Sequence, residues 1–233
     1  MTTASLTSSA PVEASVLHRG SDYSSVASLA HRGLWTVAHE RNSLAALTAA
    51  FATGWGAELD VRDLGGSLVV SHDPPDDGTL RFEAVVRAYR EHGCPGALAV
   101  NVKADGLSAM LANALRDIDR DRWFAFDMSV PDMRHYAREG LPFFTRHSDL
   151  EPTPALYHEA DGVWLDDFDG GFITEERIVD HLDSGKRVAV VSPELHGRDR
   201  SRTWEQWRDW RVWGSAEVLL CTDHPTTADE VLA

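Results

Sequence analysis

Short apolar runs alternate with segments of helical character along the whole chain, and this alternation constrains the fold more than any other feature. The clearest helical segment places Leu107, Leu111, Leu115 and Ile118 on one face at intervals of three and four residues. A strand followed by a helix, repeated eight times, predicts a parallel sheet with right-handed crossovers. Eight such units in 233 residues favour closure into a (β/α)8 barrel of the TIM type over an open sheet. The predicted strands are residues 26–30, 57–61, 98–102, 123–126, 142–145, 163–165, 188–191 and 218–221.

The chain predicts a single barrel domain with one small addition and one tail. Residues 67–71 form an extra apolar run directly after Gly65 and Gly66, which predicts a β-hairpin on the second barrel strand. Residues 1–24 are rich in Ser, Thr and Ala and lack the basic start and apolar core of a signal peptide. We therefore expect a disordered tail over residues 1–24 and the barrel over residues 25–233.

The charge balance excludes several classes of partner. The chain has 37 acidic and 22 basic side chains, a formal net charge of −15. Such an excess repels nucleic acid and anionic membranes, so an anionic substrate needs a local cationic site. No apolar run approaches the roughly 20 residues of a membrane span, and two cysteines do not make a disulfide framework. We expect a cytoplasmic protein that acts on a small molecule, and the sequence makes no prediction of oligomeric state.

Polar side chains stand where the predicted strands end, which is the end of a barrel that carries active sites. Side chains alternate along a strand, so Glu58 and Asp60 share one face, and Asn101 and Lys103 share one face of the next strand. Two carboxylates buried side by side are costly unless a cation holds them, and oxygen ligands suit Mg²⁺ or Ca²⁺. These residues therefore predict a divalent cation site. Further polar residues at strand ends are His31, Arg32, His72, Asp127, Arg146, Asp166, Glu194 and Asp223.

Each of these residues has an ordinary explanation when taken alone. A Glu-x-Asp pair is more often salt-bridged, a single histidine more often lies in a core, and Asp166 or Asp223 can cap a helix. The functional interpretation depends on the combination of several strand ends that all turn polar at the same end of the barrel. The remaining histidines are expected on helix surfaces, and they include His92, His135, His158 and His181.

Four sequence blocks carry a family resemblance. They are residues 30–33 (AHRG), residues 42–43 (NS), residues 58–61 (ELDV) and residues 69–73 (VVSHD). In this order and spacing they resemble the glycerophosphodiester phosphodiesterase family, and residues 221–225 (CTDHP) resemble its closing motif. The resemblance covers about residues 26–233. A second HRG at residues 18–20 is interpreted as a chance copy, because no strand leads into it.

The resemblance implies a TIM barrel in which His31 and His72 do acid–base work on a phosphodiester. Arg32 would hold the phosphate, and Lys103 would offset its charge. The implied metal ligands are Glu58 and Asp60, with Asn101 as a neutral third ligand, and the implied substrate is a small glycerophosphodiester. Arg146 and Glu194 are further candidates for substrate binding, and the segments 126–129 and 192–197 are expected to line a pocket particular to a subgroup.

Two residues depart from the family pattern. The third-strand motif, usually Glu-x-Lys, is here Asn101-Val102-Lys103, and Arg41 stands where the family has Glu before Asn42. Both changes leave open whether the site binds a metal ion. A related branch that resembles bacterial phosphatidylinositol-specific phospholipase C uses an arginine in place of the metal. Two alternatives to hydrolysis also stay open. The barrel could bind a phosphorylated ligand without turnover, or it could stop at a cyclic phosphate.

Overall fold

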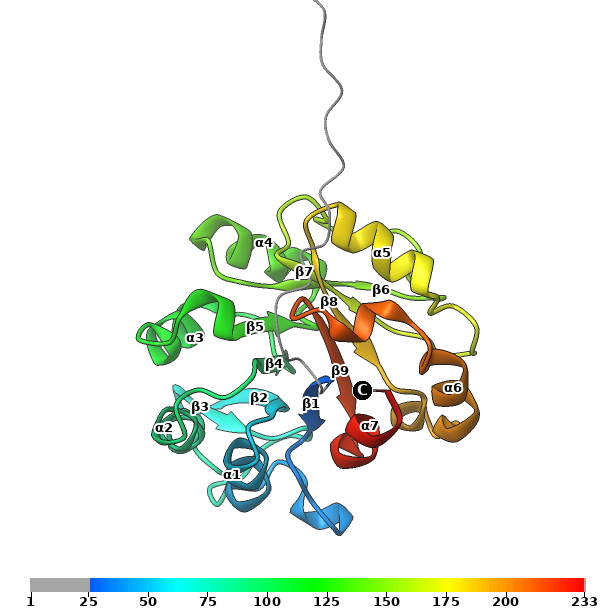
Figure 1. Ribbon diagram of the computed structural model, residues 1–233. Coiled ribbons are helices and arrows are strands. Elements are labelled where there is room, and N and C mark those ends of the chain that lie inside the picture. The colour runs from blue at the N-terminus through cyan, green and yellow to red at the C-terminus, as the bar shows by residue number, and fades with distance from the viewer. Residues whose placement is uncertain (1–25, 233) are drawn as a thin grey trace, which may run out of the picture.

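The computed structural model describes residues 26–232, and these form one sheet that curves into a barrel surrounded by helices (Figure 1). All barrel strands run parallel, and β3 alone is antiparallel, to β2. The strands are β1 (Ala27–His31), β2 (Gly56–Leu64), β3 (Ser67–Val70), β4 (Leu98–Val102), β5 (Trp123–Phe126), β6 (Phe144–His147), β7 (Gly162–Leu165), β8 (Arg187–Val191) and β9 (Val218–Thr222).

The eight parallel strands close into a barrel. Their order is β5-β4-β2-β1-β9-β8-β7-β6, so β5 and β6 are the two edges that must meet. A parallel bridge between Ala125 and Phe143 joins them, and the Ala125 N–H donates to the carbonyl oxygen of Pro142 at 3.0 Å. The predicted (β/α)8 barrel is therefore confirmed, and all eight predicted barrel strands are present with their ends moved by no more than three residues.

Helices follow seven of the eight barrel strands within residues 26–232. The expectation of a helix after every strand is wrong at one place, the connection from β6 to β7, where Pro152 and Pro154 remove two backbone donors and disfavour helical geometry. The helices are α1 (Leu44–Ala52), α2 (Phe82–Glu91), α3 (Ser108–Leu115), α4 (Val130–Glu139), α5 (Glu175–Asp183), α6 (Arg200–Trp207) and α7 (Pro225–Leu232). Four short 3-10 turns are η1 (Ala38–Glu40), η2 (Arg120–Arg122), η3 (Pro193–His196) and η4 (Arg211–Gly214).

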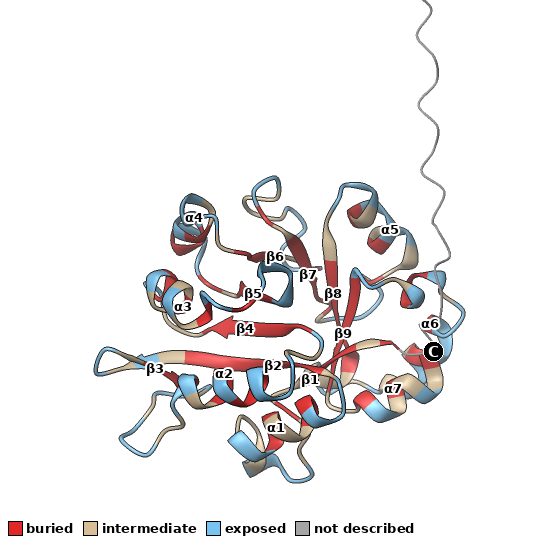
Figure 2. Cartoon of the chain, turned by 60° about the vertical axis from the view of Figure 1, so that its left-hand side comes forward, coloured by how far each residue is buried: buried red, intermediate tan, exposed pale blue. Residues whose placement is uncertain are grey.

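The strands are the most buried part of the molecule (Figure 2). In β5 the side chains alternate: Trp123 and Ala125 pack outward against helices, whereas Phe124 and Phe126 fill the barrel interior. Phe124 stacks on Phe144 with ring centroids 3.7 Å apart. Because aromatic side chains fill the barrel, space for a ligand exists at its ends and not along its axis.

Local sequence signals account for the hairpin and for the start of α1. Gly65 and Gly66 have φ values of +57° and +80°, the backbone that a tight hairpin turn between β2 and β3 requires. The Ser43 hydroxyl accepts from the N–H of Ala46 and caps α1, a position that favours serine. The predicted tail, residues 1–24, and the second HRG lie outside the described residues.

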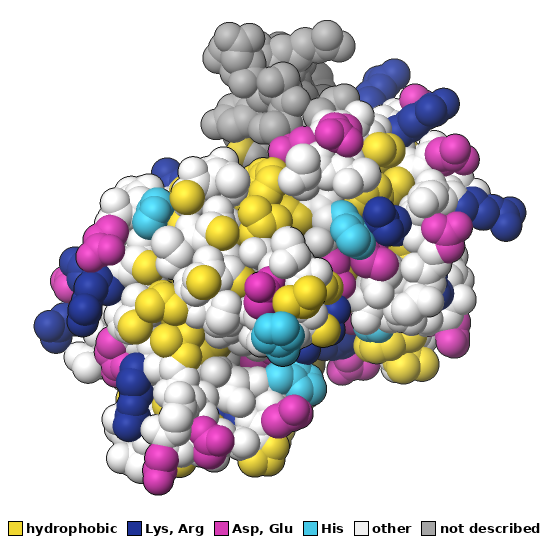
Figure 3. All heavy atoms as spheres, turned by 90° about the horizontal axis from the view of Figure 1, so that it is seen from below, with side chains coloured by type: hydrophobic (Ala, Val, Ile, Leu, Met, Phe, Trp, Pro, Cys, Tyr) yellow, Lys and Arg dark blue, Asp and Glu magenta, His cyan; other side chains and the backbone are white. Residues whose placement is uncertain are grey.

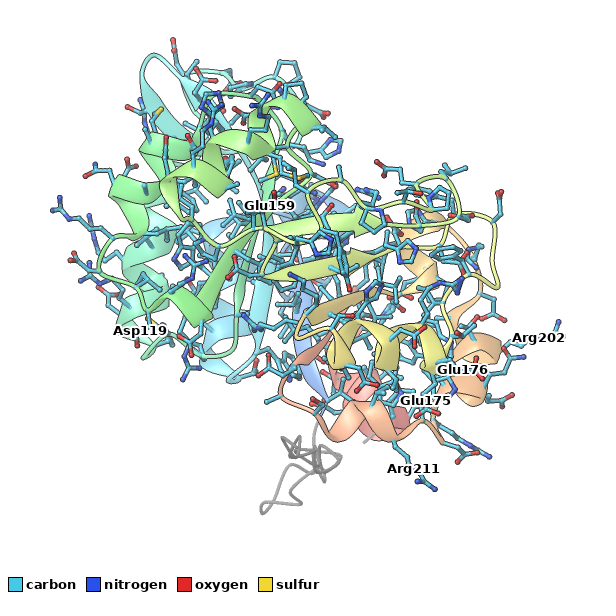
Figure 4. All side chains as sticks on the ribbon, turned by 90° about the horizontal axis from the view of Figure 1, so that it is seen from above. Asp119, Glu159, Glu175, Glu176, Arg202 and Arg211 are labelled. Carbon is cyan, nitrogen blue, oxygen red and sulfur yellow. The ribbon has the colours of Figure 1, made fainter. Side chains whose placement is uncertain are left out.

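A polar contact joins the start of α5 to η4 at the outside of the barrel. Glu175, in the first turn of α5, accepts from the backbone N–H of Arg211 in η4. Glu176 follows it, and both carboxylates are favourable near a helix N-terminus. Figure 4 labels these residues at the periphery of the barrel. None of the helices between residues 26 and 232 has the length and apolar composition that crossing a bilayer requires.

Candidate active site

His31 stands at the end of β1 and is held by the neighbouring strand end. Its Nδ1 atom lies 2.6 Å from Oδ1 of Asp223, which directly follows β9. The other oxygen of Asp223 lies 3.4 Å from an Nη atom of Arg41. A carboxylate on Nδ1 sets the orientation of the imidazole. The second ring nitrogen, Nε2, lies 3.9 Å from Oε2 of Glu58.

The turn after His31 brings Arg32 into contact with Glu58 and Asp60. Arg32 has a φ of +58°, an uncommon backbone for a residue with a side chain. Its N–H donates to Oε2 of Glu58 at 3.2 Å, and its Nε lies 2.9 Å from Oδ2 of Asp60. Gly33 is required next to it, because a Cβ there would lie 2.6 Å from the carbonyl carbon of Ala46.

Glu58 and Asp60 lie together on one face of β2, as predicted, and both are buried. Asp60 is surrounded by donors: Asn42 Nδ2 at 2.8 Å, Arg32, and Lys103 Nζ at 3.3 Å. Glu58 accepts from Nδ2 of Asn101 at 3.2 Å. Burial, reinforced by the neighbouring Asp60, raises the pKa of Glu58 to about 7. The strand ends of β1, β2 and β4 thus bring the predicted polar residues into one cluster.

The three predicted metal ligands suit a hard divalent cation by donor type. Asp60 and Asn101 are partners in the register between β2 and β4. Oδ1 of Asn101 is a buried oxygen without a hydrogen-bond partner in the described residues, and Oδ1 of Asp60 contacts only Lys103 Nζ, at 3.3 Å. With Glu58 they form an all-oxygen set that fits Mg²⁺ or Ca²⁺. Lys103 already supplies positive charge to Asp60. Residues 26–232 contain no group of three or more His, Cys, Asp or Glu side chains placed to hold a metal ion.

His72 lies apart from this cluster. It follows β3, its side chain is 48% exposed, and its Nδ1 lies 3.0 Å from Oδ1 of Asp73. Among the described residues no hydrogen bond or ion pair joins it to His31, and it does not line the cavity described next. The backbone does place it nearby, since the N–H of Ser71 donates to the carbonyl oxygen of Asp60. Its catalytic role stays a prediction.

A cavity of about 480 Å³ opens at the strand ends beside His31. Its central cation is Arg146 of β6, which pairs with Asp127, Asp166 and Glu151. Histidine, acidic and basic side chains lie close together near the centre of the face seen from below (Figure 3). The lining residues are His31, Glu58, Asn101, Phe126, Asp127, Arg146, Leu150, Glu151, Trp164, Asp166, Phe168, Val191, Leu195 and His196.

Glu194 is engaged by its own protein neighbours. Its carboxylate accepts from the hydroxyls of Ser192 and Thr222 and from the N–H of Asp223 at 3.2 Å. Glu194 is absent from the residues that line the cavity. The structure therefore places Glu194 behind Asp223, from whose backbone N–H it accepts, and its contact with substrate stays a prediction.

Several residues of the site were not assigned a role from sequence. Asp223 and Asp166 stand at strand ends, and that position was the signal that could have found them. His196 lies in the segment 192–197, expected to line a pocket, and its Nε2 lies 2.6 Å from Oδ1 of Asp166. Phe168, whose ring centroid lies 4.5 Å from that of His196, follows β7 by three residues and carried no sequence signal.

Known proteins resemble this chain in structure. No protein-family model and no curated protein sequence matches it. A chain from Galdieria sulphuraria, assigned as a glycerophosphodiester phosphodiesterase, superposes with a TM-score of 0.67 at 17% identity, over 88% of this chain and 96% of that one. A phosphodiesterase from Oleispira antarctica, solved with sn-glycerol-3-phosphate, superposes with a TM-score of 0.64 at 15% identity, over 89% of this chain and 97% of that one.

A third similar structure is a Ca²⁺-dependent phosphatidylinositol-specific phospholipase C from Streptomyces antibioticus. Its TM-score is 0.50 at 11% identity, over 91% of this chain and 98% of that one. These matches span nearly the whole of each relative, and they agree with the fold that the sequence blocks predicted. The chain therefore has the TIM-barrel fold of the solved glycerophosphodiester phosphodiesterases.

Proposed function

We propose that this protein is a phosphodiesterase that hydrolyses a glycerophosphodiester-like small molecule. The observation that carries the proposal is the His31–Asp223 pair, whose Nδ1–Oδ1 distance is 2.6 Å, at the edge of a cavity at the strand ends. A histidine held on one nitrogen by a carboxylate, with the other nitrogen free, is suited to proton transfer near neutral pH. The fold shared with glycerophosphodiester phosphodiesterases supports the same conclusion.

In the proposed reaction a water oxygen attacks phosphorus and the bond from phosphorus to the leaving alcohol breaks. One histidine takes the proton that the water loses, and the other gives a proton to the departing alkoxide. His31 fills one of these roles through Nε2, and His72 is proposed for the other. The preceding residue, Ser71, donates its N–H to the carbonyl oxygen of Asp60, and the half-exposed His72 side chain is accessible to a bound substrate.

The phosphate is proposed to sit beside Arg32 and Lys103. Both side chains are about one-fifth exposed and both face Asp60, so their remaining N–H groups can contact phosphoryl oxygens. Glu58, Asp60 and Asn101 are the proposed ligands of a divalent cation, which when bound would stabilise negative charge on the phosphoryl oxygens. Arg41, held against Asp223, is the alternative source of positive charge at the same edge.

The proposal is tested with a panel of glycerophosphodiesters incubated in ¹⁸O-water, with and without chelator, and followed by phosphorus NMR. We expect a linear phosphomonoester that carries one ¹⁸O atom from the solvent. A cyclic phosphate without solvent oxygen would identify a cyclising enzyme instead. Binding of the diesters without any product would contradict the proposal and favour a barrel that only binds phosphorylated ligands.

A further inference from the structure

A line of hydrogen bonds runs from α6 to the end of β9, behind the site that holds His31. We infer that Glu194 is a positioning residue, which holds Asp223, and through it His31, in the orientation that proton transfer requires. The inference rests on the proposed function, and it adds a residue that acts on His31 without touching the substrate. Its basis is the set of hydrogen bonds, the burial and the backbone geometry around Glu194.

The Glu194 carboxylate receives three donors from two neighbouring strand ends. Oε1 accepts from the Thr222 hydroxyl and, at 3.2 Å, from the backbone N–H of Asp223. Oε2 accepts from the Ser192 hydroxyl. Thr222 is the last residue of β9 and Ser192 directly follows β8. One carboxylate therefore joins the ends of these two strands at the residue that contacts His31.

The line continues from Ser192 into the outer core. The indole N–H of Trp204, in α6, donates to the Ser192 hydroxyl oxygen at 3.0 Å. Trp204 is 1% exposed, and Ser192 and Thr222 are fully buried. Each polar atom of these side chains, and each oxygen of Glu194, has a partner among the described residues. Such a network resists displacement, because a shift leaves a buried donor or acceptor without its partner.

The backbone that carries Glu194 is also held in place. Glu194 lies in η3, which begins at Pro193, where the ring fixes φ, and ends before Gly197 at φ +71°. The N–H of Gly197 donates to the carbonyl oxygen of Glu194 at 2.9 Å. The N–H of Ser192 donates to the carbonyl oxygen of Cys221 at 3.0 Å, which keeps β8 and β9 together up to η3. The carboxylate thus projects from a fixed turn.

The line reaches the cavity through Asp223 and His31. Glu194, Ser192 and Thr222 are absent from the residues that line the cavity, whereas His31 lines it. Oδ1 of Asp223 lies 2.6 Å from Nδ1 of His31 and carries any displacement of the Asp223 backbone onward. A displacement of about 1 Å in a reacting group can cost about 10²-fold in rate. Loss of the Glu194 carboxylate should therefore lower kcat and leave KM nearly unchanged.

Two variants of Glu194 separate positioning from contact with the substrate. Glu194→Ala leaves three donors without an acceptor and should lower kcat about 10²-fold. Glu194→Gln keeps an oxygen for the Asp223 N–H, and its amide can donate to the Ser192 hydroxyl, which is free to rotate. It should retain kcat within about fivefold of the wild type. A carboxylate that contacts the substrate would instead make both variants similarly poor and raise KM.

Ser192→Ala tests the line at a residue that is buried too deeply to touch a substrate. It should lower kcat roughly fivefold and leave KM unchanged, because the Glu194 carboxylate loses one of its donors. The matched control is Ser108→Ala, which removes a buried serine hydroxyl that donates to Glu139 at 3.4 Å, away from this line. It should leave kcat unchanged.

Proton NMR measures the positioning directly. The downfield resonance of the proton between His31 Nδ1 and Asp223, assigned by its absence in His31→Ala, should shift or broaden in Glu194→Ala and Ser192→Ala. It should stay in place in Ser108→Ala. Thermal melts check the fold of each variant, and Ser192→Ala gives the answer if Glu194→Ala does not fold.

An unchanged His31 resonance in the folded variants, or an equal loss of kcat in Ser108→Ala, would overturn the inference. A raised KM in both Glu194→Ala and Glu194→Gln would do the same, and it would assign Glu194 to substrate binding. If no diester is cleaved but the resonance responds as expected, the proposed function fails and the positioning by Glu194 stands.

Discussion

Oδ1 of Asp223 lies 2.6 Å from Nδ1 of His31, and the two residues come from the ends of β9 and β1, the last and first strands of the barrel. This contact links the closing segment of the chain to its first motif. It leaves the other ring nitrogen, Nε2, 3.9 Å from Oε2 of Glu58. We therefore propose Asp223 as a positioning residue for His31, and Arg41 and Glu194 in turn contact Asp223.

Asp223→Asn is expected to lower kcat by roughly 10²-fold or more while KM changes little, since the amide no longer favours the productive tautomer and the charged imidazole. Steady-state kinetics measure kcat and KM separately, and thermal melts check the fold. A purely structural role would instead lower the melting temperature together with kcat.

His72→Ala is expected to cost at least about 10²-fold in turnover and to leave thermal stability nearly unchanged, because the side chain is half exposed. The double variant with His31→Ala should lose much less than the product of the two single losses, since the two groups act as a unit. Single-turnover rates of the three variants provide the comparison. Independent, multiplying losses would separate the roles of the two histidines.

Asn101→Glu is expected to tighten binding of Mg²⁺ or Ca²⁺, since affinity of oxygen sites rises with ligand charge, whereas Glu58→Gln and Asp60→Asn should abolish it. Lys103, 3.3 Å from Asp60, opposes the cation in all four proteins. Calorimetric titrations of the wild type and the three variants measure this. No binding to the wild type, together with full activity in chelator, would remove the metal and make Arg41 the leading source of the missing charge.

His181 predicts a pH dependence of stability. It is buried and hydrogen-bonded to His147 and Tyr157, and burial lowers its pKa to about 4 from the usual 6.5. Between these values the unfolded chain binds a proton that the folded protein excludes, so the free energy of unfolding falls as pH drops from 6.5 to 4, by roughly 3 kcal/mol in the limit. His181→Gln should weaken that decline.

Thermal melts of wild type and His181→Gln between pH 4 and pH 7 measure the difference. The matched control is His158→Gln, which alters an exposed histidine on the neighbouring loop and should melt in parallel with the wild type at every pH. A constant gap between His181→Gln and the wild type across this range would show that the neutral histidine contributes through packing alone.

Local sequence patterns, namely the alternation of strands with helices and the turn residues, predict most of this fold. The alternation of strands and helices predicted the barrel, and Gly65-Gly66 predicted the hairpin that carries β3. The rule of one helix per strand fails after β6, where Pro152 and Pro154 interrupt the connection to β7. His181 was wrongly expected at the surface. Its partners His147 and Tyr157 lie more than 20 residues away and give no local signal.

The sequence predicted part of the candidate site, and the remaining contacts depend on the folded barrel. Alternation along β2 and β4 predicted that Glu58, Asp60 and Asn101 would share one place, because side-chain direction in a strand follows from position. Asn42 shows the limit: it directly precedes Ser43, which caps α1, but its own side chain exchanges two hydrogen bonds with Asp60 on another strand. Such contacts depend on how the closed barrel brings distant loops together. The spacing of residues along the sequence does not predict this arrangement.

The central claim is that His31, oriented by Asp223, performs acid–base chemistry on a phosphodiester. The most direct test is kcat/KM of His31→Ala and of the wild type on the best glycerophosphodiester of the panel, with thermal melts of both. A loss of at least about 10²-fold with an unchanged melting temperature is the predicted result. Wild-type-like turnover by His31→Ala would contradict the claim.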